Sequence, residues 1–198
     1  MVLKDSNTAT LSEEEAKRLI IKIKMEGLAE QLHEPYLAKK IDKIISEALD
    51  LVHEAKGLRG LSFDNDRVNE AIERCIEYGW LDYAQKLCEA FPVEPLTLAD
   101  ERRKEAEAKG INALYAKGYM RLGDVAMSMF NFTPSHDMTR EQFKVYLRSG
   151  NVDAAAEYAH KHSITAQEIA DLVRETTDPK TGHTQINYNA YLRTLDNY

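Results

Sequence analysis

The sequence predicts an all-α fold in which helical hairpins form a solenoid-like array. Three observations predict this fold. Apolar residues recur every three or four positions through most of the chain, which is the period of an α-helix with one buried face. Only five prolines and nine glycines interrupt the 198 residues, so long helices are favoured over many short strands. A turn motif that begins with glycine occurs twice, with matching apolar positions around it.

An N-terminal helical hairpin is expected over residues 12–57, behind a polar, flexible tail of residues 1–11. Ser12 followed by Glu15 forms a capping box, which favours a helix start at this point, and the first helix should end before Pro35. Its apolar positions form two stripes, the first of Ala16, Ile20 and Ile23, the second of Ile21, Met25, Leu28 and Leu32. Together they predict one broad apolar face and a hairpin whose outside is nearly polar.

A helical-repeat region is expected over residues 64–118. Asp64 or Asp66 can cap its first helix, and Gly79 should turn the chain into a helix over residues 80–91. Further helices are expected over residues 97–110 and 111–117 and, in the C-terminal region 119–198, over residues 119–129, 139–149, 151–162, 165–176 and 188–195.

The turn motif Gly-x-apolar-Asp-x-Ala occurs at Gly79–Ala84 and again at Gly150–Ala155, a shift of 71 residues from position 79 to position 150. Glycine permits a tight turn, Asp can cap the following helix, and Ala lets two helices approach closely. The pattern is similar to tetratricopeptide-like helical-hairpin repeats, although neither copy has the full consensus of that family. The resemblance implies surfaces that bind peptides or other subunits. The alternative is a helical bundle that uses the same turn twice.

Two segments near the C-terminus share one order of features: a helix or aromatic residue, a polar loop, a central apolar residue and an aromatic helix start. Residues 130–143 place Met138 at the central position, and residues 165–192 place Ile186 there. These segments resemble a pair of EF-hands of the calmodulin and myosin light-chain family, over about residues 120–196. The helix expected over residues 151–162 makes the separation between Met138 and Ile186 longer than in an ordinary EF-hand pair. Descent from such a pair and coincidence therefore both remain open.

Neither loop keeps the acids that calcium requires. Calcium takes six to eight oxygen ligands, with acids at the first and third loop positions and a bidentate Glu at the twelfth. The first, third, fifth and twelfth positions are Asn131, Thr133, Ser135 and Gln142 in one loop, and Pro179, Thr181, His183 and Ala190 in the other. We therefore expect no bound metal and no cofactor; a calcium-responsive sensor is the alternative that this loss of acids disfavours.

Residues 68–91 carry a further pattern, Val68–Cys75 (Val-Asn-Glu-Ala-Ile-Glu-Arg-Cys) followed by Leu81, Lys86, Leu87 and Glu89. It is similar to the helical-repeat core of cytochrome c oxidase subunit Va, a non-catalytic peripheral subunit on the matrix side of the mitochondrial membrane. The resemblance implies an alternative function as a peripheral subunit of a respiratory complex.

Composition excludes several classes of function. The formal net charge of −7 disfavours nucleic-acid binding, which needs an excess of Lys and Arg, and we interpret the basic run Arg102–Lys104 as a solvated helix face. Cys75 and Cys88 are too few for a secreted disulfide framework, which favours a reducing, intracellular compartment. That compartment would be the cytoplasm, or the mitochondrion for a respiratory-complex subunit, although the first residues match no presequence. No apolar run approaches the ~20 residues of a spanning helix, so no membrane insertion is expected.

Motifs of catalysis are missing from the sequence, including the glycine-rich phosphate loops and the zinc-protease and serine-hydrolase signatures. We therefore predict a non-catalytic, calcium-independent protein-binding or structural subunit of a larger assembly; a small helical enzyme without a recognisable motif is the remaining alternative. The expected partner is a protein, presenting a helix or belonging to a larger complex. Aromatic and Met side chains suit adaptable helix-binding grooves, and the candidate partner-binding residues are Trp80, Tyr83, Met127, Met129, Phe130 and Phe132.

Overall fold

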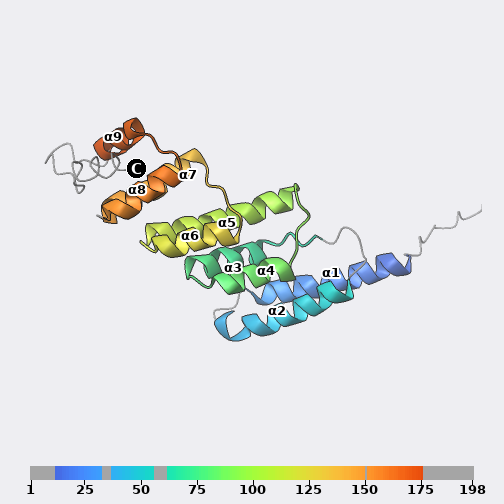
Figure 1. Cartoon of the computed structure of the whole chain (residues 1–198). Coiled ribbons are helices and arrows are strands. Elements are labelled where there is room, and N and C mark those ends of the chain that lie inside the picture. The colour runs from blue at the N-terminus through green and yellow to red at the C-terminus, as the bar shows by residue number, and fades with distance from the viewer. Residues whose placement is uncertain (1–11, 33–36, 56–61, 150, 176–198) are drawn as a thin grey trace, which may run out of the picture. The chain divides into compact units, whose positions relative to one another are not determined.

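The structure is a computed structural model that describes residues 12–32, 37–55, 62–149 and 151–175. Within these ranges it contains nine α-helices and no β-strand (Figure 1), which confirms the predicted all-α class. The helices are α1 (Glu13–Gln31), α2 (Leu37–Glu54), α3 (Asp66–Glu77), α4 (Leu81–Ala90), α5 (Leu98–Ala116), α6 (Met120–Met129), α7 (His136–Ser149), α8 (Val152–Lys161) and α9 (Ala166–Glu175).

Two compact units divide the chain. The first contains residues 1–75 and 80–107, and the second contains residues 76–79 and 108–198. The division falls inside α5, which the sequence had suggested to be two helices meeting near Gly110 and which is in fact continuous through that buried glycine. The predicted second EF-hand-like loop and the predicted helix over residues 188–195 lie outside the described residues.

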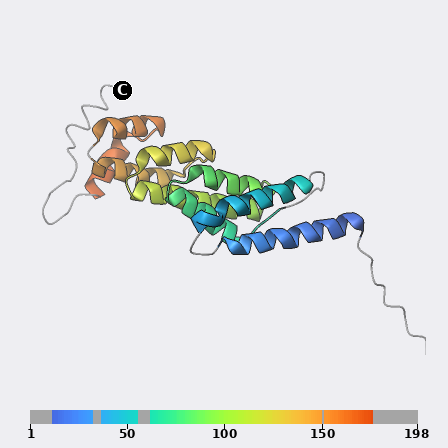
Figure 2. The ribbon, with the colours of Figure 1, turned by 90° about the horizontal axis from the view of Figure 1, so that it is seen from below.

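The helix α1 begins as its sequence predicts. The Oγ atom of Ser12 accepts a hydrogen bond of 3.2 Å from the backbone N–H of Glu15, and the Glu15 carboxylate accepts one of 2.8 Å from the Ser12 N–H. This reciprocal pair is the expected capping box, and it satisfies two backbone donors that a helix start would otherwise leave open. Helix α2 packs beside α1 and also against α4, all within the first unit; Figure 2 shows α2 alongside α1.

Only one of the two apolar stripes of α1 is buried. Ile21 and Met25 are each 1% exposed, whereas Ile20 and Ile23 are 54% and 58% exposed. The prediction of one broad buried face with a nearly polar outside is therefore wrong. Successive residues are separated by about 100° around a helix, and α2 covers the side of Ile21 but leaves the side of Ile20 to solvent.

A buried polar cluster joins α3, α4 and α5 in the first unit. Arg103 is 3% exposed; its Nε donates to Oδ1 of Asn69 at 2.8 Å and its Nη2 donates to the carbonyl oxygen of Phe91 at 3.1 Å. The interpretation of residues 102–104 as a solvated face is thus wrong for Arg103, because its guanidinium finds oxygen acceptors on two neighbouring helical segments. Such charge-assisted bonds allow a cation to be buried.

The turns that follow α3 and α5 have the same geometry. Gly79 and Gly118 adopt φ angles of +77° and +81°, a left-handed conformation that glycine adopts without steric cost. The residue after each glycine donates its N–H to the carbonyl five positions earlier, at 2.7 Å for Trp80 and 2.9 Å for Tyr119. These bonds satisfy carbonyl groups at the helix ends and turn the chain into the next helix. The corresponding Gly150 lies outside the described residues.

Candidate functional site

Among the described residues of the first unit, α1 carries a group of three exposed large apolar side chains. Leu19, Ile20 and Ile23 are 48%, 54% and 58% exposed, and their spacing of three and four residues places them on one side of the helix. Ala16 and Gly27 extend the same side by one turn in each direction. We call these five residues the α1 outer face. Contiguous exposed apolar patches often mark sites of protein interaction.

A groove of about 450 Å³ between α1 and α2 borders this face. Gly27 lines the groove as well as belonging to the α1 outer face, so the two surfaces are continuous. Apolar atoms of Leu28 and Leu51 contribute to its floor. The groove therefore combines apolar and charged lining residues and meets the α1 outer face at Gly27.

Carboxylates dominate the polar lining of the groove. Glu47, Asp50 and Glu54 follow one another along α2 at intervals of three and four residues, and Lys24 lines the opposite wall on α1. Lys43 lies 3.6 Å from Glu47 as an exposed ion pair, which contributes little stability. Because Glu47 is paired with Lys43, Asp50 and Glu54 against Lys24 leave the groove with a net negative charge that favours a cationic partner.

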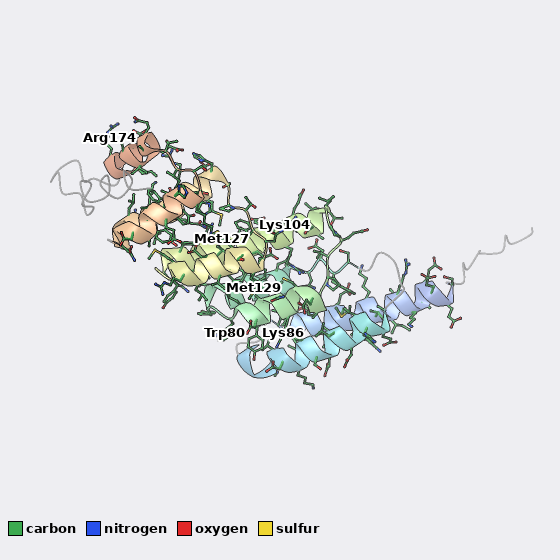
Figure 3. The ribbon with its side chains drawn as sticks, viewed as in Figure 1. Trp80, Lys86, Lys104, Met127, Met129 and Arg174 are labelled. Carbon is green, nitrogen blue, oxygen red and sulfur yellow. The ribbon has the colours of Figure 1, made fainter. Side chains whose placement is uncertain are left out.

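Two of the predicted partner-binding residues lie together in the first unit. Trp80 is 41% exposed, and its ring meets that of Tyr83 edge-on at 6.5 Å between centroids. The Tyr83 hydroxyl donates a hydrogen bond of 3.2 Å to Asp42 on α2, and the negative charge of Asp42 raises the pKa of Tyr83. The ammonium group of Lys86 lies 5.6 Å from the centre of the Tyr83 ring. This small aromatic cluster links α4 to α2, and Figure 3 shows Trp80 at the start of α4.

The other four predicted residues belong to the second unit, at the end of α6. Met127 is 5% exposed and belongs to the core, which removes it from the candidate surface, whereas Met129 is 36% exposed (Figure 3). Phe130 and Phe132 are half-buried and flank Asn131, whose φ of +48° turns the chain after α6. The six predicted residues are thus divided between the two units, and neither unit assembles all of them into one surface.

A network of tyrosines forms a buried polar cluster in the second unit that the sequence did not predict. The two carboxylate oxygens of Asp124 accept hydrogen bonds from the hydroxyls of Tyr115, at 2.5 Å, and Tyr146, at 2.8 Å. Tyr158 donates to Oε1 of Gln142, and its ring lies 4.7 Å from that of Tyr146. No motif in the sequence indicated this network, because its residues come from four helices and follow one another at irregular intervals along the chain.

The protonation of this network argues for a structural role. Burial is the main cause that raises the pKa of Tyr115 and of Tyr146, and the hydrogen bond to Asp124 is the second cause. Burial also raises the pKa of Tyr158. A group that transfers protons at neutral pH needs a pKa near 7, and these shifts move the tyrosines away from it. We therefore assign the network to holding α5, α6, α7 and α8 together.

The thiols of the first unit are also poorly suited to chemistry. Cys75 is fully buried, and Cys88 is half-buried with its Sγ 3.7 Å from Oε1 of Glu107. Burial raises the pKa of Cys75 to about 12 and that of Cys88 to about 11. The nucleophilic form of cysteine is the thiolate, so both thiols are held in the unreactive form at neutral pH.

Within the described ranges, no group of three or more His, Cys, Asp or Glu side chains is placed to hold a metal ion. The first EF-hand-like segment departs from a calcium loop in its backbone as well, because α7 already begins at His136. No helix among the described residues combines the length and apolarity needed to cross a membrane.

The comparisons found no matching protein-family model, curated protein or solved structure.

Proposed function

We propose that this chain is a non-catalytic protein-binding subunit of a larger assembly, and that its binding does not depend on calcium. The observation that carries the proposal is the α1 outer face. Its three large apolar side chains, Leu19, Ile20 and Ile23, are about half exposed or more. Covering such side chains with a partner removes apolar area from water and contributes roughly 25 cal/mol per Å² buried.

The helix turns support the same proposal. Gly118 begins the segment Gly-Tyr-Met-Arg-Leu-Gly, which aligns with the turn motifs that start at Gly79 and Gly150. Its fourth and sixth positions are Arg121 and Gly123 where the other copies have Asp and Ala, so the match is hidden in the sequence. We interpret the three turns as successive copies of a helical-hairpin unit, in an array of the kind that binds peptides or subunits.

The proposal is tested by quantitative affinity purification of the tagged full chain from its native cells. The wild type is compared with the double variant Ile20→Lys/Ile23→Lys, which leaves the buried stripe of α1 unchanged. Leu98→Lys serves as the matched control, because Leu98 is 62% exposed and lies outside the α1 outer face.

We expect at least one protein to be recovered with the wild type and with Leu98→Lys, but lost with the double variant. Equal recovery with all three forms would overturn the proposal that the α1 outer face binds a partner. Circular dichroism spectra of the three forms establish that each is folded to the same extent.

A further inference from the structure

We propose that the α1 outer face and the adjoining groove bind an amphipathic helix of a partner protein whose flank carries lysines or arginines. This inference rests on the proposed function and deepens it by stating the chemistry of the partner. The apolar side of the partner helix lies on Leu19, Ile20 and Ile23. Its basic flank lies over Asp50 and Glu54, on the α2 side of the groove.

The dimensions of the surface fit a helix. From Ala16 to Gly27 the α1 outer face extends about 17 Å, at about 1.5 Å per residue, which is the length of roughly three helical turns. The two ends of the face are small residues, and a methyl group built on Gly27 would meet nothing within 4 Å. Small residues let two helix axes approach closely, while the isoleucines between them fill the spaces between side chains of a partner helix.

The groove specifies the charge of the partner. Glu47, Asp50 and Glu54 lie along one side of α2 at the spacing of successive helical turns. A partner helix that lies parallel or antiparallel to α1 places the residues of one flank at the same spacing above them. Lysines or arginines in that flank would pair with the carboxylates, whereas acidic residues would be repelled.

The same charges disfavour two other occupants. A second copy of the chain would bring another groove lined by three carboxylates toward the first, and each copy has a formal net charge of −7. An anionic lipid surface would be repelled for the same reason. A cationic amphipathic helix is the occupant that satisfies both the apolar face and its acidic border.

Two synthetic helices of about 18 residues provide the test. Both have leucines at intervals of three and four residues, and their flanks carry lysines in one peptide and glutamates in the other. Binding of the labelled peptides to the full chain is followed by fluorescence anisotropy. We expect the lysine peptide to bind at least about tenfold more tightly than the glutamate peptide, and to lose affinity as salt increases.

Substitutions then assign the binding to this site. Ile20→Ser/Ile23→Ser should weaken the lysine peptide by about tenfold or more. Asp50→Lys/Glu54→Lys should reverse the preference, so that the glutamate peptide binds more tightly. The control Glu89→Lys/Glu101→Lys makes the same change of net charge at exposed positions of the same unit, and should leave the preference for the lysine peptide in place.

Three results would overturn the inference: equal binding of the two peptides, a preference that Asp50→Lys/Glu54→Lys leaves unchanged, and a preference that the control variant also reverses. A wild-type dimer that Ile20→Ser/Ile23→Ser converts to monomer would identify a second copy as the occupant instead. Binding to vesicles that contain phosphatidylglycerol would identify a lipid surface. The two proposals fail separately, because a native partner lost with Ile20→Lys/Ile23→Lys would stand even if the peptides showed no charge preference.

Discussion

The hydroxyl of Tyr115 donates a hydrogen bond of 2.5 Å to Oδ1 of Asp124, nine residues further along the chain. The bond crosses the turn between α5 and α6, and the second carboxylate oxygen of Asp124 accepts from Tyr146 on α7. Tyr115 is 1% exposed and Tyr146 is 4% exposed. One carboxylate therefore satisfies two buried donors from different helices.

Replacing Asp124 with Leu should destabilise the second unit by about 2–4 kcal/mol, because each unsatisfied buried donor costs about 1–3 kcal/mol. Urea unfolding followed by circular dichroism measures the change. In the background of Tyr115→Phe/Tyr146→Phe, the same Asp124→Leu change should cost much less, because no hydroxyl is left without an acceptor. An equal cost in both backgrounds would show that the hydrogen bonds are not the cause.

Stability should fall as the pH rises above about 10. The pKa of Tyr115 and of Tyr146 is raised in the folded chain by burial and by Asp124, so the unfolded chain ionises first. The contribution of these two tyrosines to the free energy of unfolding is complete below the pKa that they have in the unfolded chain. It decreases as the pH rises above that value toward their pKa in the folded chain. Urea unfolding at pH 9, 10 and 11 measures the slope, and tyrosinate absorbance should increase on unfolding. Tyr115→Phe/Tyr146→Phe should flatten the slope; an unchanged slope would contradict the assignment.

Gly123→Ala should destabilise the chain although alanine is the better helix former. A Cβ atom at Gly123 would lie 2.5 Å from Cε2 of Tyr115, and overpacking of this kind costs about 1–3 kcal/mol. Gly27→Ala is the matched comparison, because its methyl group meets nothing within 4 Å. That variant should gain about 0.5–1 kcal/mol from helix propensity. Opposite signs in thermal or urea unfolding are expected, and a gain from both substitutions would contradict the close approach of Tyr115.

Calcium should leave the thermal stability unchanged. The segment from Asn131 to Gln142 offers no carboxylate at its first, third or twelfth loop position, and a ligand stabilises a protein only as far as it binds the folded form. Millimolar calcium, compared with the same buffer containing a chelator, should shift the melting temperature by less than about 1 °C. A larger shift would indicate a calcium site and would revive the sensor alternative.

The sequence alone determined where many of the helices begin and end, because these signals are local. The capping box of Ser12 and Glu15 forms as predicted, and Gly79 turns the chain where predicted, with a left-handed backbone. The helical period also predicted part of the core, because Ile21, Met25 and Leu32 of one predicted stripe are all buried. A segment's own backbone and periodicity carry this information without reference to the rest of the chain.

Tertiary structure decided which apolar residues remained exposed. Ile20 and Ile21 are neighbours with the same side chain and both fit a helical stripe, yet their exposed fractions are 54% and 1%. Their periodicity is equivalent, so only the tertiary packing around α1 distinguishes them. Tertiary structure also decided the burial of Arg103. Its charge predicted a solvated side chain, but Asn69 and Phe91 provide oxygen acceptors that allow it to be buried. Helix formation depends on near neighbours in the sequence, whereas the exposure of a side chain depends on segments that meet only after folding. For this reason only the tertiary structure could reveal the α1 outer face.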